Sequence, residues 1–208
     1  QFSSPINIAI PSGNFGNAYS AWFGRDNGLS INEIFCASNV NDVLTRFISS
    51  GKLEPKETIP SVAPSMDIQI PSSLERLIYN FEGEASSFYD QLQNEKIAKL
   101  SEESVVKLQN IFSSLSFNDE MILKEIDLFY KNYGWVIDPH TATALSSSVS
   151  FSSTLPVVGV ATASPEKFSD VISKTIDEFR VESTKNEEKY FVQKANSSLV
   201  ENTIKECL

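Results

Sequence analysis

The stretch I-A-I-P-S-G-N-F-G-N-A-Y-S-A-W, from Ile8 to Trp22, joins an apolar run to a helix-like pattern through a loop that contains Gly13 and Gly16. Residues 6–10 predict a short buried strand, and residues 17–25 predict the helix that follows it. A loop in this position presents unpaired backbone N–H groups at the positive end of the helix dipole. Glycines let such a loop come close to a bulky anion. The stretch therefore predicts either a phosphate cradle or a tight strand-to-helix turn without a ligand.

The alternation of strand and helix continues after this loop. Residues 32–38 form a second apolar run, and Asn41-Asp42 offers an N-cap for a helix that Gly51 ends. Strand and helix in alternation indicate a parallel α/β sheet. Prolines then interrupt residues 51–71, which predicts a long ordered loop. Amphipathic patterns predict further helices near residues 71–83, 101–112 and 118–133.

The same alternation returns near the end of the chain. Asp138 is placed to cap a helix with Pro139 at its first position, and residues 155–162 predict a second buried strand. Ser164 is the expected cap of a helix over residues 164–179. The predicted fold class is α/β, a parallel sheet flanked by helices, with extra surface helices in the middle of the chain.

Composition narrows the classes of function. The chain has 208 residues and a formal net charge of −10, which argues against binding of nucleic acid or an anionic membrane. No apolar stretch approaches the ~20 residues of a spanning helix, and there is no secretory signal. The single histidine, His140, excludes a multi-histidine metal site, so we expect no metal. Cys36 and Cys207 are far apart and are expected to be reduced thiols of a cytoplasmic protein.

Three known phosphate-loop or nucleic-acid motifs fit the glycine loop poorly. A P-loop needs G-x-x-x-x-G-K-[ST], and neither its lysine nor its spacing is present. The Rossmann fingerprint needs G-x-G-x-x-G, of which only the last pair occurs. A KH-type G-x-x-G clamp needs basic flanks, which this acidic chain lacks.

The stretch P-S-G-N-F-G-N (residues 11–17) is similar to the phosphate loop of threonine synthases, which use pyridoxal 5'-phosphate (PLP). Four further blocks resemble the same family in the same order. They are C-A-S-N-V-N-D-V-L-T-R-F-I-S-S-G (36–51), A-P-S-M-D-I-Q-I-P-S-S-L-E-R-L (63–77), D-P-H-T-A-T-A-L (138–145) and V-A-T-A-S-P-E-K-F (160–168). The five blocks are spread over nearly the whole chain. Between them, residues 83–133 carry no motif of the family, and the tail after Arg180 carries almost none.

The resemblance implies a fold type II PLP enzyme, with residues 1–208 as the carboxy-terminal part of its large PLP-binding domain. Residues 72–133 are then a mostly helical, insertion-like segment and residues 185–208 a tail. The cofactor phosphate is expected to lie among Gly13, Asn14, Phe15, Gly16 and Asn17.

The resemblance also assigns Thr162 to the pyridine nitrogen of the cofactor. A neutral hydroxyl there would leave the nitrogen largely unprotonated and moderate the ring as an electron sink. The alternative role for Thr162 is to cap the helix at Pro165. His140 is expected to have a minor structural role and no catalytic one.

The lysine that forms the Schiff base in threonine synthases is missing. In the family it lies upstream of the glycine loop in a Phe-Lys-Asp context, which this chain lacks. Gln1 is not an initiator methionine, and the first predicted strand follows it closely. We therefore expect a piece of a longer protein, with the amino-terminal half as its missing partner, no catalytic residue of its own, and no activity alone.

The expected function of the whole enzyme is conversion of O-phospho-L-homoserine and water to L-threonine and phosphate. The alternative is a non-catalytic threonine synthase-like binding or regulatory protein. A serine or threonine dehydratase, or a tryptophan synthase β-like chain, fits less well, because those families do not share the Ser-x-Met-Asp and Asp-Pro-His-Thr blocks together.

Overall fold

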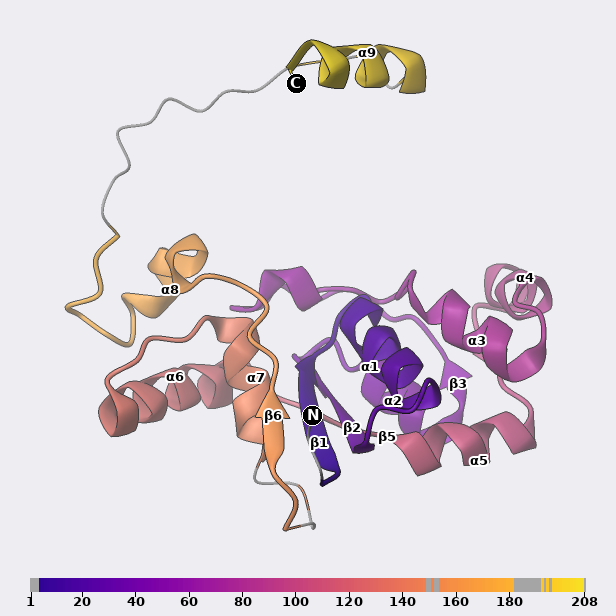
Figure 1. Ribbon diagram of the computed structural model, residues 1–208, viewed down its shortest axis with the longest axis horizontal. Helices are drawn as coiled ribbons and strands as arrows, with labels where there is room; N and C mark the ends of the chain where they lie inside the picture. Colours follow the sequence, from indigo (N-terminus) through magenta and orange to yellow (C-terminus); the bar gives the residue numbers. More distant parts are fainter. Residues whose placement is uncertain are drawn as a thin grey trace.

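A sheet of parallel strands in the order β5-β2-β1-β6 forms the centre of the protein (Figure 1). The structure is a computed structural model that describes residues 4–148, 151, 154–181, 192, 194 and 196–207. Ile8 of β1 lies opposite Ile34 of β2 on one side and Val158 of β6 on the other. The predicted parallel α/β fold is confirmed. The strands are β1 (Ile6–Pro11), β2 (Ile31–Ser38), β5 (Phe112–Ser116) and β6 (Val157–Gly159).

The first two strand–helix units follow the sequence prediction closely. α1 (Gly16–Asp26) begins directly after the glycine loop, and α2 (Val43–Ser50) follows β2. Gly51 ends α2 in the left-handed conformation, with φ at 70°, which a glycine adopts without steric cost. These units deliver both strand ends to the same edge of the sheet.

Each face of the sheet has its own hydrophobic cluster, because side chains alternate along a strand. Ile10, Ile34 and Cys36 pack against α1 and α2. Phe35 and Ala37 point the other way, toward α6 and α7. Figure 1 shows α1 and α2 on one side of the strands and α6 and α7 on the other.

The free thiol of Cys36 is fully buried in the first of these clusters. Burial raises its pKa to about 12, against a smaller lowering by the hydrogen bond with Ser12. The thiol therefore stays protonated and behaves as a small apolar group. The side chain of Cys207 lies outside the described residues.

The middle of the chain is mostly helical, and it also supplies an outer strand of the sheet. β5 follows α5 at once and pairs with β2, with Ser114 opposite Cys36. The sequence prediction ran a helix to Phe112 and contained no strand here. The helices are α3 (Leu74–Glu82), α4 (Ser86–Glu95), α5 (Glu102–Ile111) and α6 (Asp119–Tyr133), and β3 (Lys52–Leu53) pairs antiparallel with β4 (Ala98–Lys99).

The carboxy-terminal elements differ from the prediction in length. α7 (Pro139–Ser148) begins where expected, but β6 covers only Val157–Gly159 instead of a buried strand over 155–162. β6 is an outer strand, and Val158 is 41% exposed. The helix expected over 164–179 is split into η2 (Pro165–Phe168) and α8 (Ser169–Ile172). A last helix, α9, spans Ser197–Cys207.

The two tryptophans lie in opposite environments. Trp22 of α1 is 6% exposed, with its ring 5.4 Å from that of Tyr19 and 5.9 Å from that of Phe81. Trp135 follows α6 and is 74% exposed. Within the described residues, no helix combines the length and the apolar composition required to cross a membrane.

Candidate functional site

The glycine loop leaves a row of backbone donors without partners. Ser12 donates its N–H to the carbonyl of Ala37 at 2.8 Å, and Tyr19 donates to the carbonyl of Phe15 at 2.9 Å. Between them, the N–H groups of residues 13–17 have no acceptor among the described residues. α1 also begins without a side-chain cap. Unpaired donors at a helix start are the usual backbone site for an anion.

The loop holds its shape through a residue in an unfavourable conformation. Phe15 has a φ of 68°, in the left-handed region that side chains rarely adopt. Its ring is buried, and its centroid lies 5.3 Å from that of Phe112. Because backbone strain persists only where the surroundings enforce it, the packing of this ring fixes the turn into α1.

Gly13 is required by the close approach of a second segment. A Cβ atom at this position would lie 2.8 Å from Met66 Cα and 3.0 Å from the carbonyl oxygen of Ser65. Both contacts are with backbone, so neither atom can rotate out of the way. The turn at η1 (Pro64–Met66) thus forms a wall against the loop.

Asn14 joins the loop to the segment that precedes α3. Its side-chain oxygen accepts hydrogen bonds from the backbone N–H of Ser72 at 2.6 Å and from the Ser72 hydroxyl at 2.9 Å. Its carbonyl accepts from the N–H of Ser73 at 3.2 Å. The acceptor end of this amide is therefore occupied, and the side chain holds the loop in place.

A cavity of about 240 Å³ opens over this loop. Thr162, which follows β6, lines it together with the loop that follows β1. Since β1 and β6 are adjacent and parallel, both segments leave the carboxyl edge of the sheet, where open α/β folds bind ligands. The structure thus brings all six residues of the predicted site to one cavity. Its lining consists of Pro11, Ser12, Gly13, Asn14, Phe15, Gly16, Asn17, Ser65, Met66, His140 and Thr162.

His140 is one of the lining residues that sequence reasoning did not place at the site; Ser65 and Met66 are others. Its ring nitrogen Nδ1 lies 2.8 Å from Asp138 Oδ1, and Nε2 accepts the backbone N–H of Ser65 at 3.2 Å. Both His140 and Asp138 are buried. The block Asp-Pro-His-Thr at a helix start was the one sequence signal that involved His140. It does not indicate the contact with Ser65, because the two residues are 75 positions apart in the sequence.

Asp138 is held as a carboxylate by its neighbours. Burial acts to raise its pKa, but hydrogen bonds from His140 and Thr141 outweigh burial, so the pKa lies below its usual value. The carboxylate accepts from the backbone N–H of His140 at 2.9 Å and from the Thr141 hydroxyl. The same carboxylate therefore both caps α7 and orients the imidazole of His140.

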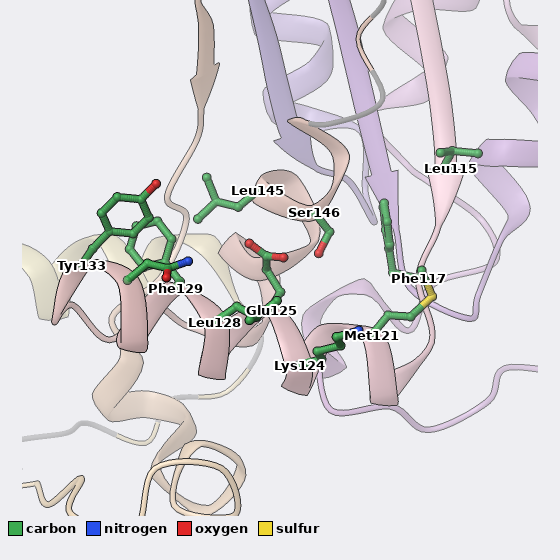
Figure 2. Close-up of a pocket in the computed structure, with 11 residues that line it drawn as sticks. Leu115, Phe117, Met121, Lys124, Glu125, Leu128, Phe129, Tyr133, Leu145 and Ser146 are labelled. Carbon is green, nitrogen blue, oxygen red and sulfur yellow. The ribbon is translucent and has the colours of Figure 1, made fainter.

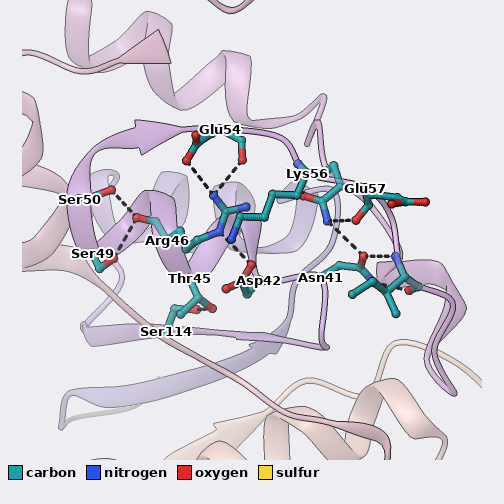
Figure 3. A network of polar contacts seen from close by, with 12 residues as sticks. Asn41, Asp42, Thr45, Arg46, Ser49, Ser50, Glu54, Lys56, Glu57 and Ser114 are labelled. Carbon is teal, nitrogen blue, oxygen red and sulfur yellow. Dashed lines mark hydrogen bonds and ion pairs between the residues drawn. The ribbon is translucent and has the colours of Figure 1, made fainter. Parts of the chain in front are cut away.

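Amide side chains hold the long proline-rich segment against the sheet edge. Asn41 donates to the carbonyl of Ile59 at 2.8 Å and accepts from its N–H at 2.9 Å. Figure 3 shows Asn41 in this network with Arg46, which bonds Asp42 at 2.9 Å and the carbonyl of Glu54 at 2.9 Å. These contacts fix the path of the chain toward the turn at η1.

A larger cavity of about 660 Å³ lies between β5, α6 and α7 (Figure 2). Its lining is mainly apolar, with Leu115, Phe117 and Leu128 among its residues. Glu125 is a polar exception, and burial raises its pKa against a smaller lowering by Ser146. The smaller cavity is the candidate site, because it is the one lined by the glycine loop with its row of free backbone donors.

Two kinds of group are absent from the candidate site in the described part of the chain. No lysine is among the residues that line the smaller cavity. No group of three or more His, Cys, Asp or Glu side chains in the described ranges is arranged to hold a metal ion.

Comparison with known proteins gives threonine synthases and threonine synthase-like proteins among the relatives, although no family model matches. Threonine synthase of Pseudomonas aeruginosa is 31% identical over 175 residues, which are 81% of this chain and 37% of that protein. Threonine synthase-like 1 of Macaca fascicularis is 32% identical over 205 residues, 95% of this chain and 28% of that protein. PLP-bound threonine synthase of Brucella melitensis superposes with a TM-score of 0.80 at 28% identity, over 84% of this chain and 39% of that one. The chain thus spans less than half the length of these relatives.

Proposed function

The chain belongs to the threonine synthase family and has the fold type II architecture, and we propose that it supplies the phosphate cradle and the ring-nitrogen partner of a PLP site. The single observation that carries this proposal is that residues 13–17, with their row of unpaired N–H groups, line the same cavity as Thr162.

The residues present fit a cofactor that carries a phosphate. The loop offers backbone donors at a helix start, and Gly13 keeps it free of a side chain where η1 approaches. Thr162 offers a neutral hydroxyl, which can bond an unprotonated pyridine nitrogen. When bound, PLP supplies the electron-withdrawing ring on which the chemistry of this family depends. The chain's own part is to bind the phosphate and orient the ring.

The proposed reaction of the whole protein is the conversion of O-phospho-L-homoserine and water to L-threonine and phosphate. A lysine must move protons in such a reaction, and none of the described residues that line the cavity is a lysine. We therefore propose that this lysine lies in polypeptide outside this chain, and that the chain alone has no turnover.

A second candidate is a threonine synthase-like protein that binds PLP without this reaction. It is favoured by the similarity to a protein named threonine synthase-like 1, which extends over 95% of this chain. The two candidates share the cradle and differ only in turnover.

Binding of PLP to the isolated chain, measured by equilibrium dialysis, tests the cradle. We expect inorganic phosphate to compete with PLP, and pyridoxal without its phosphate to bind much more weakly. Gly13→Ala forces a Cβ against backbone atoms and should weaken PLP binding by about tenfold or more. Gly83→Ala is the matched control, because it strains a left-handed glycine with open space around it.

Equal PLP affinity of the Gly13→Ala and Gly83→Ala variants would show that the loop is not part of the PLP site. Phosphate release from O-phospho-L-homoserine separates the remaining possibilities. The isolated chain with PLP should release none, and release at an enzyme-like rate would overturn the proposal of a lysine elsewhere. In a longer protein that contains this chain, turnover supports the enzyme and PLP binding without turnover supports the second candidate.

A further inference from the structure

The imidazole of His140 contacts the segments that form two different walls of the candidate cavity. Through Nε2 it holds the backbone N–H of Ser65 in η1, at 3.2 Å. Its ring centroid also lies 4.7 Å from that of Phe168, at an angle of 57°. Phe168 ends η2, the short helix that follows Thr162. One side chain therefore touches both the Ser65 turn and the segment that carries Thr162.

The hydrogen bonds of His140 define its tautomer. Nε2 receives the N–H of Ser65, so Nε2 carries a lone pair and no proton. Nδ1 must then donate its proton to Asp138 Oδ1, which lies 2.8 Å away. Asp138 is fixed in turn by the start of α7, through the N–H of His140 at 2.9 Å and the hydroxyl of Thr141. A carboxylate that fixes one imidazole nitrogen determines what the other nitrogen can bind.

The Ser65 turn in turn limits the position of the glycine loop. Met66 Cα and the Ser65 carbonyl would lie only 2.8 and 3.0 Å from a Cβ on Gly13. The loop and the turn are therefore in backbone contact, and a shift of Ser65 changes the space over residues 13–17. His140 acts on this space through its hydrogen bond with Ser65.

We propose that Asp138 and His140 are positioning residues that brace the Ser65 turn and the Thr162 segment, and so set the width of the phosphate cradle. This inference rests on the proposed function. His140 itself makes no bond to the anion, because both of its ring nitrogens already have partners. Its effect on the ligand passes through Ser65 and Phe168.

The tautomer is tested first, on the unaltered chain. The chain has one histidine, so long-range ¹H–¹⁵N NMR spectra of a ¹⁵N-histidine sample contain one imidazole. We expect Nδ1 to be protonated and Nε2 to be bare at neutral pH. Inorganic phosphate should shift the imidazole signals of this sample and the Ser65 amide of a uniformly ¹⁵N-labelled sample. The opposite tautomer, or no shift at a phosphate concentration that saturates the loop, would overturn the proposal.

Two substitutions then separate positioning from bulk stability. In His140→Gln the amide oxygen takes the place of Nε2 and can still accept the Ser65 N–H, whereas in His140→Asn the shorter side chain reaches only as far as Nδ1. We expect His140→Asn to lose about tenfold in affinity for inorganic phosphate, measured by calorimetry, and His140→Gln to retain most of it. Thermal unfolding of both variants reports their stability separately.

Equal losses in the two variants, or no loss in either, would overturn the positioning role while leaving the cradle intact. Failure of the unaltered chain to bind phosphate or PLP would instead overturn the proposed function, and this inference with it. The tautomer measurement needs no variant, so the proposed role of Asp138 and His140 is tested even if a substitution prevents folding.

Discussion

Asp138 is the side chain that connects helix capping with the candidate site. It caps α7, accepts from Nδ1 of His140 and is buried, so hydrogen bonds are needed to hold its charge. Its pKa lies below the usual value because those hydrogen bonds outweigh burial. A carboxylate of this kind links the stability of the fold to pH.

Asp138 should therefore contribute to acid unfolding. Because its folded pKa is lowered, its contribution is fully present above the unfolded pKa of about 3.9 and is lost as pH falls from there through the folded pKa. We expect Asp138→Asn to be less stable at pH 7 by about 1–3 kcal/mol and to lose less stability than the parent chain below pH ~4. Urea unfolding across pH 3–7 measures this. Asp90→Asn, at an exposed position of α4, is the control, and equal pH profiles for the two variants would contradict the expectation.

At the scale of elements, caps define helix ends here more sharply than apolar periodicity does. α6 is preceded by the cap residue Asn118, whose side chain accepts the N–H of Met121 at 2.9 Å, and is followed by Gly134 in the left-handed conformation. Between these ends, Ile122 and Ile126 pack into the cluster on the second face of the sheet. The cap thus fixes the start of the helix that covers this face.

Removal of the cap on α6 should destabilise the whole chain modestly. We expect Asn118→Ala to lower the free energy of unfolding by about 1 kcal/mol, because the first turn of α6 loses an acceptor. Asn118→Asp keeps an oxygen acceptor at the helix start and should unfold like the parent chain. Thermal unfolding of the three proteins measures the difference, and an unchanged midpoint in Asn118→Ala would show that water replaces the cap at no cost.

Sequence predicts the elements whose signals are local and misses those decided by pairing. α6 and α7 begin where the side-chain caps Asn118 and Asp138 place them, and α2 and α6 end at the glycines Gly51 and Gly134. Asp42, the expected cap of α2, makes no capping hydrogen bond. β5 reads F-S-S-L-S, too polar for a strand signal, and it forms because it pairs with β2. The hydroxyl of Ser114 also donates a hydrogen bond to the carbonyl of Cys36 at 2.5 Å, which adds a contact between β5 and β2.

The same distinction applies to the candidate site. The glycine loop and Thr162 belong to short motifs, so the sequence indicates them directly. Ser65 and His140 reach the cavity through a contact between segments 75 positions apart. No local pattern contains that contact, so their place at the cavity emerges only from the packing of η1 against α7.

At the scale of the whole molecule, the two outer strands of the sheet avoid pairing with other chains in different ways. Within the described residues, β5 and β6 each have a neighbour on one side only. Leu115 of β5 is 46% exposed beside the larger cavity, but Ser113, Ser114 and Ser116 make most of that strand polar. β6 is only three residues long. Short or polar outer strands limit pairing with other chains, and the net charge of −10 adds repulsion.

The opposite environments of Trp22 and Trp135 give the protein a built-in optical reporter. Trp22 lies on the helix that starts at the glycine loop, so its emission should respond to an anion there, whereas the exposed Trp135 contributes background. Trp135→Phe should leave one emission at short wavelength that acrylamide, an uncharged quencher, reaches poorly. Trp22→Phe is the control and should leave a readily quenched, long-wavelength emission. If phosphate changed the emission of the Trp22→Phe protein instead, the ligand would act near Trp135, at the end of α6, and the fluorescence of this chain would report on a different part of the fold.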